Sequence, residues 1–306
     1  MSQSISVGRF APSPTGPLHF GSLIAALSSF IHAKYHKGKW LVRIEDIDPP
    51  REVPGSSDRI LRQLEQHGLI WDDQVLYQSS RLDSYNQILQ SLRDHKRVYY
   101  CQCNRQRLVS LGGVYDGNCR NLALGPQDCA LRLAVTKALS SAEPETVSIG
   151  FTDNIMGNFS QQLTHGIGDF VLRRRDGLIA YQLAVVIDDQ YQGITQVVRG
   201  ADLLDSTPKQ ILLQQCLGYQ TPEYTHIPLA VNSEGQKLSK QTFAKTLTEG
   251  HERENLWIAL KWLQQDPPQE LRQATVEEII NWGIEHWDLT SIPTSMQAVP
   301  AFSTNI

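Results

Sequence analysis

The sequence lacks the features of membrane and secreted proteins. None of its apolar runs approaches the roughly 18 residues that a membrane-spanning helix requires. The N-terminal residues M-S-Q-S-I-S contain neither the charged nor the apolar segment of a secretory signal peptide. With 41% hydrophobic and 20% charged residues, the composition is that of an ordinary globular protein. We therefore expect a cytoplasmic protein that binds no membrane, and we expect it to be a monomer.

The sequence also lacks a strongly basic charge, internal repeats and the GxxxxGK[ST] motif of a P-loop nucleotide site. Its 28 basic and 32 acidic residues give a net charge of −4, which does not by itself indicate nucleic-acid binding. A nucleic acid would have to contact local basic patches. The candidates are Arg173–Arg175 and a cluster of Arg105, Arg107 and Arg120, although such runs are more often solvated surface.

Strand and helix patterns alternate along most of the chain. Apolar runs between turn residues predict strands at residues 6–10, 40–45, 195–200 and 227–232. Apolar residues at helical spacing predict helices at 21–37, 55–68, 81–96 and 203–217. This alternation predicts an α/β fold with a doubly wound parallel sheet, in which ligands bind beyond the carboxyl ends of the strands.

Other segments depart from this alternation. Residues 98–165 carry several cysteines and loop signals, and we expect them to form an insertion. An Asp-Gly pair predicts a turn that joins two strands, 169–174 and 178–184, as a hairpin. Only helical patterns follow residue 245, and we expect the residues beyond Pro293 to be poorly ordered.

The segment Arg9–Ser22 reads R-F-A-P-S-P-T-G-P-L-H-F-G-S and joins an expected strand to an expected helix. A helix N-terminus presents unpaired N–H groups and the positive end of the helix dipole, so it can bind phosphate. Gly21 lacks a Cβ and lets a nucleotide approach the backbone, and His19 can donate to a phosphate oxygen as charge builds. The alternative is an ordinary strand–turn–helix with a solvated histidine.

A second motif, K-L-S-K-Q at Lys237–Gln241, follows an expected strand and turn. Its two lysines, Lys237 and Lys240, with Ser239 as a further donor, suit a mobile loop over a pyrophosphate, because lysine is a flexible point charge. Alone, the motif is better explained as an exposed basic turn. In this order and spacing, the two motifs together predict ATP bound between them.

Charged side chains near the expected strand ends predict the second substrate. Arg9 and Arg199 favour an amino acid with a side-chain carboxylate, because arginine pairs carboxylates bidentately. Glu45 could hold the α-ammonium group, and the Tyr181 hydroxyl could orient the substrate. The alternative for each is structural: Glu45 with Arg43 would be an ordinary charge pair at a strand end, and Tyr181 an amphipathic rim residue.

Three cysteines form a second constellation. Cys101 and Cys103 are one residue apart, and Cys119 lies in a nearby glycine-rich loop, which suits a tetrahedral metal ion such as zinc. The fourth position is open, and Asp116, Cys129 or a water molecule are candidates. The alternative is buried free cysteines without a metal. We expect no disulfide in a reducing compartment, and we expect a structural metal.

Three segments together closely resemble the glutamyl branch of class I aminoacyl-tRNA synthetases. Two of them are R-F-A-P-S-P-T-G, which begins at Arg9, and R-I-E-D-I-D, which begins at Arg43. The first segment continues to His19-Phe-Gly-Ser, which stands at the HIGH signature of that family. The third segment, Lys237–Gln241, stands at its KMSKS signature, with glutamine at the last position. The resemblance covers residues 5–245 and implies a Rossmann-like catalytic domain.

The resemblance also implies which residues bind which substrate. It makes ATP, with Mg²⁺ on its phosphates, and L-glutamate the substrates. The residues expected to bind ATP are His19, Gly21, Ser22, Lys237, Ser239 and Lys240, and the catalytic ones among them are His19, Lys237 and Lys240. The residues expected to bind glutamate are Arg9, Ala11, Ser13, Glu45, Tyr181 and Arg199.

The resemblance divides the chain into four parts. Residues 1–97 and 166–241 are expected to form the two halves of the catalytic domain, and the second half ends in the Lys237–Lys240 loop. Residues 98–165 are expected to be an inserted subdomain that contains zinc. Residues 242–306 are expected to be a helical region like the one that contacts the tRNA stem, and no anticodon-binding domain is expected after it.

This short C-terminal region and the pattern Cys-x-Cys…Tyr…Cys resemble truncated paralogs of the glutamyl synthetases. The resemblance makes Tyr115 the expected fourth ligand of a structural zinc ion. It implies that glutamate is activated as glutamyl-adenylate without tRNA and is transferred to the cyclopentenediol of queuosine, at the wobble position of tRNA(Asp). Two alternatives are a minimal glutamyl-tRNA synthetase that charges the 3′ end of tRNA(Glu) and a non-catalytic tRNA-binding module of the same fold.

Overall fold

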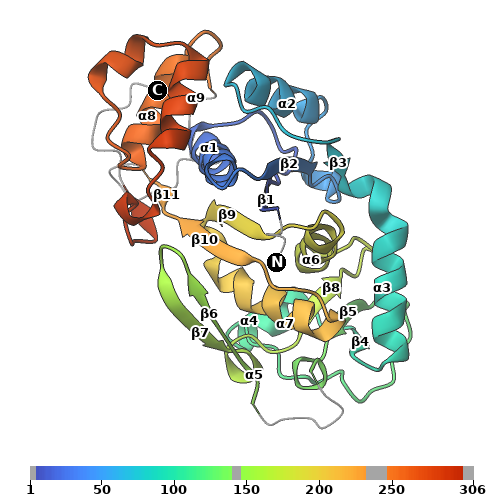
Figure 1. Ribbon diagram of the computed structural model, residues 1–306. Coiled ribbons are helices and arrows are strands. Elements are labelled where there is room, and N and C mark those ends of the chain that lie inside the picture. Colours follow the sequence, from blue (N-terminus) through green and yellow to red (C-terminus); the bar gives the residue numbers. More distant parts are fainter. Residues whose placement is uncertain (1–4, 140–145, 232–246, 299–306) are drawn as a thin grey trace.

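The computed structural model describes residues 5–139, 146–231 and 247–298, and a parallel sheet lies at its centre (Figure 1). Its strands are β1 (Val7–Phe10), β2 (Lys39–Ile44), β3 (Leu76–Tyr77), β6 (Ser148–Asp153), β7 (Gly157–Gln162), β9 (Gln196–Gly200) and β10 (Glu223–Ile227). They form two parallel groups, β1-β2-β3 and β9-β10-β6, and β7 pairs antiparallel with β6 at the edge. The groups meet where the N–H of Thr195, just before β9, donates to the Val7 carbonyl at 2.9 Å.

The side chains of this sheet alternate between two apolar cores, because successive residues of a strand point to opposite faces. In β2, Trp40 and Val42 join one core and Leu41 joins the other. In β9, Val198 joins the first core and Val197 the second. Helices cover both cores, so the predicted doubly wound α/β sheet is confirmed.

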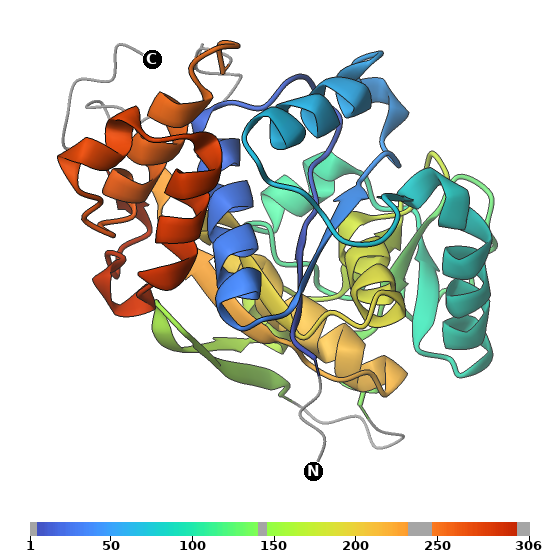
Figure 2. The same ribbon diagram turned by 45° about the horizontal axis from the view of Figure 1, so that its top comes forward.

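The first core is covered by α1 (Phe20–Tyr35) and by two C-terminal helices, α8 (Glu252–Trp262) and α9 (Val276–Glu285). Both views show these C-terminal helices next to α1 (Figure 1, Figure 2). Gly283 permits the close approach of α9, because a Cβ there would lie 2.8 Å from Ile31 Cδ1. The C-terminal helices are therefore packed on the parallel sheet through α1.

The second core is covered by helices and by a small antiparallel sheet in the order β4-β5-β8. These helices are α3 (Leu82–Asp94), α6 (Tyr181–Tyr191) and α7 (Thr207–Leu217). The strands of the small sheet are β4 (Val98–Cys101), β5 (Ala130–Leu133) and β8 (Phe170–Arg173). The remaining helices are α2 (Ser56–Gln66), α4 (Arg105–Ser110) and α5 (Leu163–Gly166). No helix within the described ranges is long and apolar enough to cross a membrane. The division of the chain into four parts stays a prediction.

The expected hairpin after residue 169 is wrong in its second half. The turn is present, since the Arg174 N–H donates to the Leu178 carbonyl at 2.8 Å. The chain then enters α6 at Tyr181 instead of continuing as a strand. Apolar residues 183–187 of this helix are all buried, so their continuous run lacks the spacing that distinguishes a helix from a strand.

Two further predictions, the strand at residues 227–232 and the poorly ordered tail, differ from the structure. Pro228 interrupts the strand expected at 227–232, because proline has no N–H to donate to a neighbouring strand. The chain continues as β11 (Leu229–Ala230), which pairs in parallel with β12 (Gln297–Ala298). The prediction that the tail beyond Pro293 is poorly ordered is therefore wrong for the part of it that the structure describes.

We expect Gly168→Ala to destabilise the protein much more than Gly157→Ala. Both glycines have left-handed backbones, with φ of +71° and +74°, so alanine costs about 1–2 kcal/mol at either position. Only at Gly168 would the new Cβ meet backbone, 2.3 Å from the Tyr115 carbonyl oxygen, whereas no described atom lies within 4 Å at Gly157. Thermal unfolding of both variants measures the difference. Equal melting temperatures would contradict a tight contact between these segments.

Candidate active site

A cavity of about 510 Å³ lies at the carboxyl ends of β1, β9 and β10. The helices that follow β1 and β9, α1 and α7, cover opposite faces of the sheet. Such a switch point is where doubly wound sheets bind ligands. Walls of the cavity include Ala11, Ser13, His19, Gly21 and Ser22 from the first motif, Gly200 at the end of β9 and Asp202 after it.

His19 is the N-cap residue of α1. Its Nδ1 accepts a hydrogen bond from the Ser22 N–H at 3.2 Å, and Ser22 Oγ accepts one from the His19 N–H at 3.5 Å. The neutral imidazole therefore carries its proton on Nε2, where it is a hydrogen-bond donor. The N–H groups and dipole of the same helix end favour a phosphate. His19, Gly21 and Ser22 thus meet at a place that can bind an anion.

A second cavity, of about 250 Å³, adjoins the first, because Ser13 and Thr15 line both. Glu45 and Tyr181 also line it. Glu45 Oε1 is buried, lies 3.7 Å from Arg43 Nη2 and accepts no hydrogen bond from a described residue. A buried carboxylate oxygen without a donor is suited to bind an ammonium group of a ligand.

Arg9 in β1 and Arg43 in β2 share the carboxylate of Asp189 in α6. Arg9 Nε lies 3.2 Å and Arg43 Nη2 lies 2.8 Å from Asp189 Oδ1, and none of the three side chains is more than 8% exposed. Burial opposes ionisation of Asp189, but the two guanidinium groups hold the pKa of this carboxyl below its usual value. Arg9 is therefore fixed next to the cavities, with part of its charge compensated.

Arg199 in β9 has a different set of partners. Its Nε donates to His226 Nε2 at 3.0 Å, and its Nη2 donates to Thr207 Oγ1 at 2.8 Å and to the Leu203 carbonyl at 3.4 Å. Its Nη1 lies 3.4 Å from the hydroxyl of Tyr181, a wall of the second cavity. All of these partners are neutral groups, so the guanidinium keeps its charge available for a carboxylate of a substrate.

The structure brings most of the predicted site residues together. The first cavity is lined by Ala11, Ser13, His19, Gly21 and Ser22, and the second by Ser13, Glu45 and Tyr181. Arg9 and Arg199 are buried and line neither cavity, but Arg9 directly precedes Phe10 in the wall of the first, and Arg199 contacts Tyr181 in the wall of the second. Lys237, Ser239 and Lys240 lie outside the described residues.

The sequence analysis missed three buried residues of this site: Asp189, Asp153 and His226. A signal for Asp189 was present, because Asp188 and Asp189 are two acidic residues directly after an apolar run. Asp153 lies in a strand distant along the chain from both motifs, His226 directly precedes the strand expected at 227–232, and no pattern in the sequence marks either residue.

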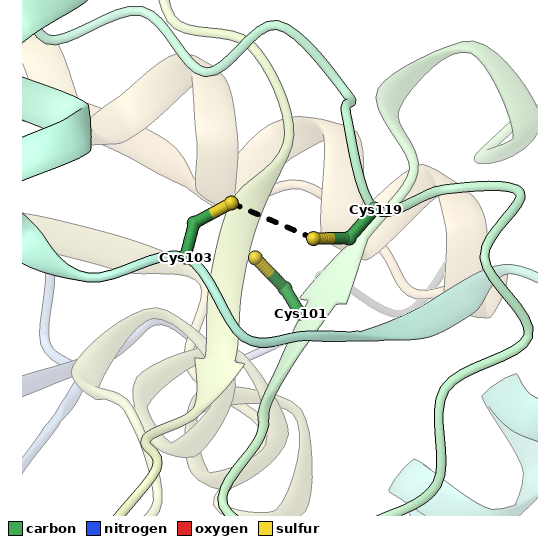
Figure 3. Close-up of side chains that lie close together, drawn as sticks. All are labelled: Cys101, Cys103 and Cys119. Carbon is green, nitrogen blue, oxygen red and sulfur yellow. Dashed lines mark hydrogen bonds between the residues drawn. The ribbon is translucent and has the colours of Figure 1, made fainter.

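Cys101, Cys103 and Cys119 lie together, with their sulfur atoms within 4.8 Å of one another (Figure 3). The sulfurs of Cys103 and Cys119 are 3.5 Å apart. Tetrahedral zinc with Zn–S bonds of about 2.3 Å needs sulfurs about 3.8 Å apart. The Tyr115 hydroxyl lies 3.3 Å from Cys101 Sγ and 3.6 Å from Cys103 Sγ. Three thiols and a phenol thus form a group that could hold a metal ion.

The other candidates for the fourth ligand lie differently. Asp116 forms an ion pair with Arg107, and Cys129 is not one of the clustered cysteines. Burial opposes ionisation of Cys119, but hydrogen bonds from Tyr115 and its neighbours lower the pKa of this thiol to about 7. Burial raises the pKa of the Cys103 thiol and of the Tyr115 phenol, so among these three donors only Cys119 is shifted toward the ionised form that binds a metal ion.

Comparison with known proteins agrees with this geometry. The family model described as tRNA synthetases class I (E and Q), catalytic domain, matches residues 6–261, and the chain belongs to this family of ligases. The matched range contains both cavities and the cysteine cluster. Enzymes of this family use ATP, an amino acid and tRNA.

Relatives within the family narrow the comparison. Glutamyl-Q tRNA(Asp) synthetase of Cronobacter sakazakii is 50% identical over 303 residues, which are 99% of this chain and 99% of that protein. The protein of the same name from Escherichia coli is 47% identical over 99% of this chain and 96% of its own length. The resemblance to truncated glutamyl-synthetase paralogs is therefore confirmed.

A solved structure extends the comparison to the fold. Glutamate-tRNA synthetase of Elizabethkingia anophelis superposes with a TM-score of 0.77 at 26% identity, and the match covers 98% of this chain and 68% of that chain. The glutamate tRNA ligase of Elizabethkingia meningosepticum, solved in complex with its amino acid, matches with the same TM-score. The predicted class I synthetase fold is confirmed.

Glutamate binding should strengthen as the pH rises through 7. Burial raises the pKa of Glu45, the predicted partner of the α-ammonium group, to about 7. Below this pH the carboxyl group is protonated and cannot pair with the ammonium, whereas above it the carboxylate can. In ATP–pyrophosphate exchange, the KM for glutamate should therefore fall between about pH 6 and about pH 8.

Glu45→Gln provides the control for this pH profile. The amide cannot ionise, so the variant should have a raised KM for glutamate that no longer depends on pH in this range. A wild-type KM that stays constant or rises with pH would contradict the role of Glu45.

Proposed function

We propose that this chain activates L-glutamate with ATP, without tRNA, and transfers the glutamyl group to the cyclopentenediol of queuosine in tRNA(Asp). The observation that carries the proposal is the identity of 47–50%, over 99% of the chain, to proteins named glutamyl-Q tRNA(Asp) synthetase. The two adjoining cavities support the activation step, because they can hold two small substrates in contact.

In this proposal ATP binds in the larger cavity, with its phosphates at the N-terminus of α1 near His19. Glutamate binds in the smaller cavity, with its α-ammonium group on Glu45 and its side-chain carboxylate facing Arg199 and Arg9. The Tyr181 hydroxyl orients it. Two arginines favour a carboxylate over an amide, because a guanidinium group forms two parallel hydrogen bonds with a carboxylate. Glutamate is therefore favoured over glutamine.

The activation step is a displacement at phosphorus. The α-carboxylate of glutamate attacks the α-phosphorus of ATP, which enters as its magnesium complex. The bond to the bridging oxygen breaks, pyrophosphate leaves, and glutamyl-adenylate remains. The Nε2–H of His19 donates to phosphate oxygens as charge builds, and Lys237 and Lys240 are predicted to add positive charge. Ser13, a wall of both cavities, lies where the substrates would meet, and such positioning supplies much of the rate.

The transfer step forms an ester. A hydroxyl of the acceptor attacks the activated carbonyl carbon, AMP leaves, and the hydroxyl loses its proton. The cyclopentenediol of queuosine offers such hydroxyls, and so does the 3′-terminal ribose of tRNA(Glu). The second acceptor is a candidate because the chain shares its fold with glutamate-tRNA synthetases at a TM-score of 0.77.

Transfer of labelled glutamate in the presence of ATP distinguishes these acceptors. Two matched pools of tRNA(Asp) are used, one with queuosine and one with unmodified guanosine at the wobble position. We expect label only in the first pool, because only queuosine carries the cyclopentenediol. Label in neither pool, together with charging of tRNA(Glu), would make the protein a minimal glutamyl-tRNA synthetase and overturn the proposal.

His19→Asn tests the catalytic role of His19 and keeps the cap of α1. Asparagine is also a good N-cap, so α1 keeps an acceptor for the Ser22 N–H, but the Nε2–H donor is lost. We expect this variant to fold and to lower the rate of activation about 100-fold or more. A rate equal to that of the wild type would contradict the role of His19.

We also propose that Cys101, Cys103, Cys119 and Tyr115 hold a structural zinc ion. The donor set fits zinc, because thiolates prefer soft metal ions and the sulfurs already lie near tetrahedral spacing. Four protein ligands would leave no open position for a substrate, so the ion would tie the loop that carries Tyr115 and Cys119 to the end of β4.

Purified protein should contain about one zinc ion per chain by elemental analysis. Cys119→Ser should lose the zinc and lower the melting temperature, whereas Cys216→Ser, which changes a cysteine outside the cluster, should retain it. Tyr115→Phe should release zinc to a chelator faster than the wild type. Equal release would contradict tyrosine as the fourth ligand, and an absence of zinc from the wild type would contradict the whole site.

A further inference from the structure

Arg199 ends a chain of three buried polar side chains. Its Nε donates to His226 Nε2 at 3.0 Å, and the other ring nitrogen of His226, Nδ1, lies 2.6 Å from Asp153 Oδ2. The three side chains come from β9, β10 and β6, which are neighbours in the sheet, and each residue is at most 5% exposed. Arg199 and His226 are direct partners in the register of β9 and β10.

The partners of His226 determine where its proton lies. Arg199 Nε can only donate, so His226 Nε2 must be the acceptor and carry no proton. The proton is therefore on Nδ1, where it is donated to the carboxylate of Asp153. With a proton on Nδ1 alone the ring is neutral. Burial lowers the pKa of His226, against the hydrogen bond to Asp153 that raises it.

A neutral acceptor has a consequence for the charge of the guanidinium group. Arg9 and Arg43 pair directly with Asp189, and a carboxylate in that position competes with a carboxylate of a ligand. His226 orients Arg199 without neutralising it, and the negative charge of Asp153 stays one side chain further away. Arg199 is thus fixed in direction and still able to form a full ion pair with a substrate.

We propose that Asp153 and His226 are positioning residues that hold Arg199 for the side-chain carboxylate of glutamate. The inference rests on the proposed activation of glutamate by ATP. It assigns a part in substrate selection to the β6–β7 hairpin, which is distant along the chain from both sequence motifs. The hairpin carries Asp153 at the end of its first strand.

Asp153 also has a purely structural set of contacts. Its Oδ1 accepts hydrogen bonds from the N–H groups of Ile155 and Met156, and its carboxylate accepts one from the His226 N–H. A test must therefore separate the positioning of Arg199 from the general stability of the hairpin. The two roles can be separated, because a loss of Arg199 positioning should weaken the binding of glutamate and leave the binding of ATP unaffected.

Asp153→Asn changes the proton on His226 with little change in shape. If the amide oxygen keeps the contacts to Ile155 and Met156, the amide NH₂ faces Nδ1 and requires a proton-free nitrogen there. The proton then moves to Nε2 of His226. Two N–H donors, Nε2–H of His226 and Nε–H of Arg199, then face each other, and the hydrogen bond between them is lost. We expect the KM for glutamate in ATP–pyrophosphate exchange to rise about 10- to 100-fold, with the KM for ATP unchanged.

His226 gives a second, independent pair of variants. Glutamine can place an amide oxygen near the position of Nε2, so His226→Gln should retain most of the affinity for glutamate. His226→Leu has no acceptor and should raise the KM for glutamate about as much as Asp153→Asn. If Asp153→Asn does not fold, this pair carries the test alone.

Thr225→Val is the matched control on the same strand. Thr225 is buried next to His226 in β10 and accepts a hydrogen bond from Asn154 Nδ2 at 2.9 Å, but it does not contact Arg199. The variant should lower the melting temperature and leave both KM values unchanged. It therefore shows what the loss of a buried hydrogen bond does to this part of the sheet.

The outcomes separate this inference from the proposed function. A wild-type protein without glutamate-dependent exchange would overturn both. An active wild type, together with Asp153→Asn or His226→Leu variants that keep its KM for glutamate or raise both KM values equally, would overturn only the inference. A rise confined to glutamate and restored by His226→Gln would support it.

Discussion

Two buried arginines on adjacent strands share one buried carboxylate, and the rest of the site is arranged around that contact. Arg9 and Arg43 both approach Asp189 Oδ1, and all three side chains are buried. Removing one partner from such a group costs about 3–5 kcal/mol, so the contact holds β1 and β2 firmly against α6. Glu45 follows two residues after Arg43, and the same contact places it at the wall of the second cavity.

The site divides its charges between two tasks. Arg9, Arg43 and Asp189 pair with one another and determine where the strand ends lie, and because two guanidinium groups share one carboxylate, a positive charge remains. Arg199 has only neutral described partners, and Glu45 Oε1 has no described hydrogen-bond donor. Buried groups that are left incompletely paired in this way are unfavourable for folding, and they are characteristic of positions where a ligand completes the pairing. A cation and an anion held open in adjacent positions suit an amino acid with a second carboxylate.

Much of the architecture could be predicted from the sequence, because its determinants are local. Apolar spacing located α1, α2 and α3, and the turn residues around Gly16 located the end of β1. The same reasoning failed at α6, where apolar residues 183–187 are all buried and no face is polar. It also failed at β11 and β12, where the pairing of Leu229 with Gln297 joins segments with no pattern in common.

The sequence by itself determined the class of enzyme, the helix that begins at His19 and the grouping of the three cysteines, because each is a short motif whose chemistry follows from neighbouring residues. Only the tertiary structure decided which arginines share a carboxylate and which has neutral partners. The partners that make this difference lie 180 residues from Arg9 and 27 residues from Arg199. Three arginines look alike in a sequence, whereas burial and the protonation state of the group opposite determine what each one can bind.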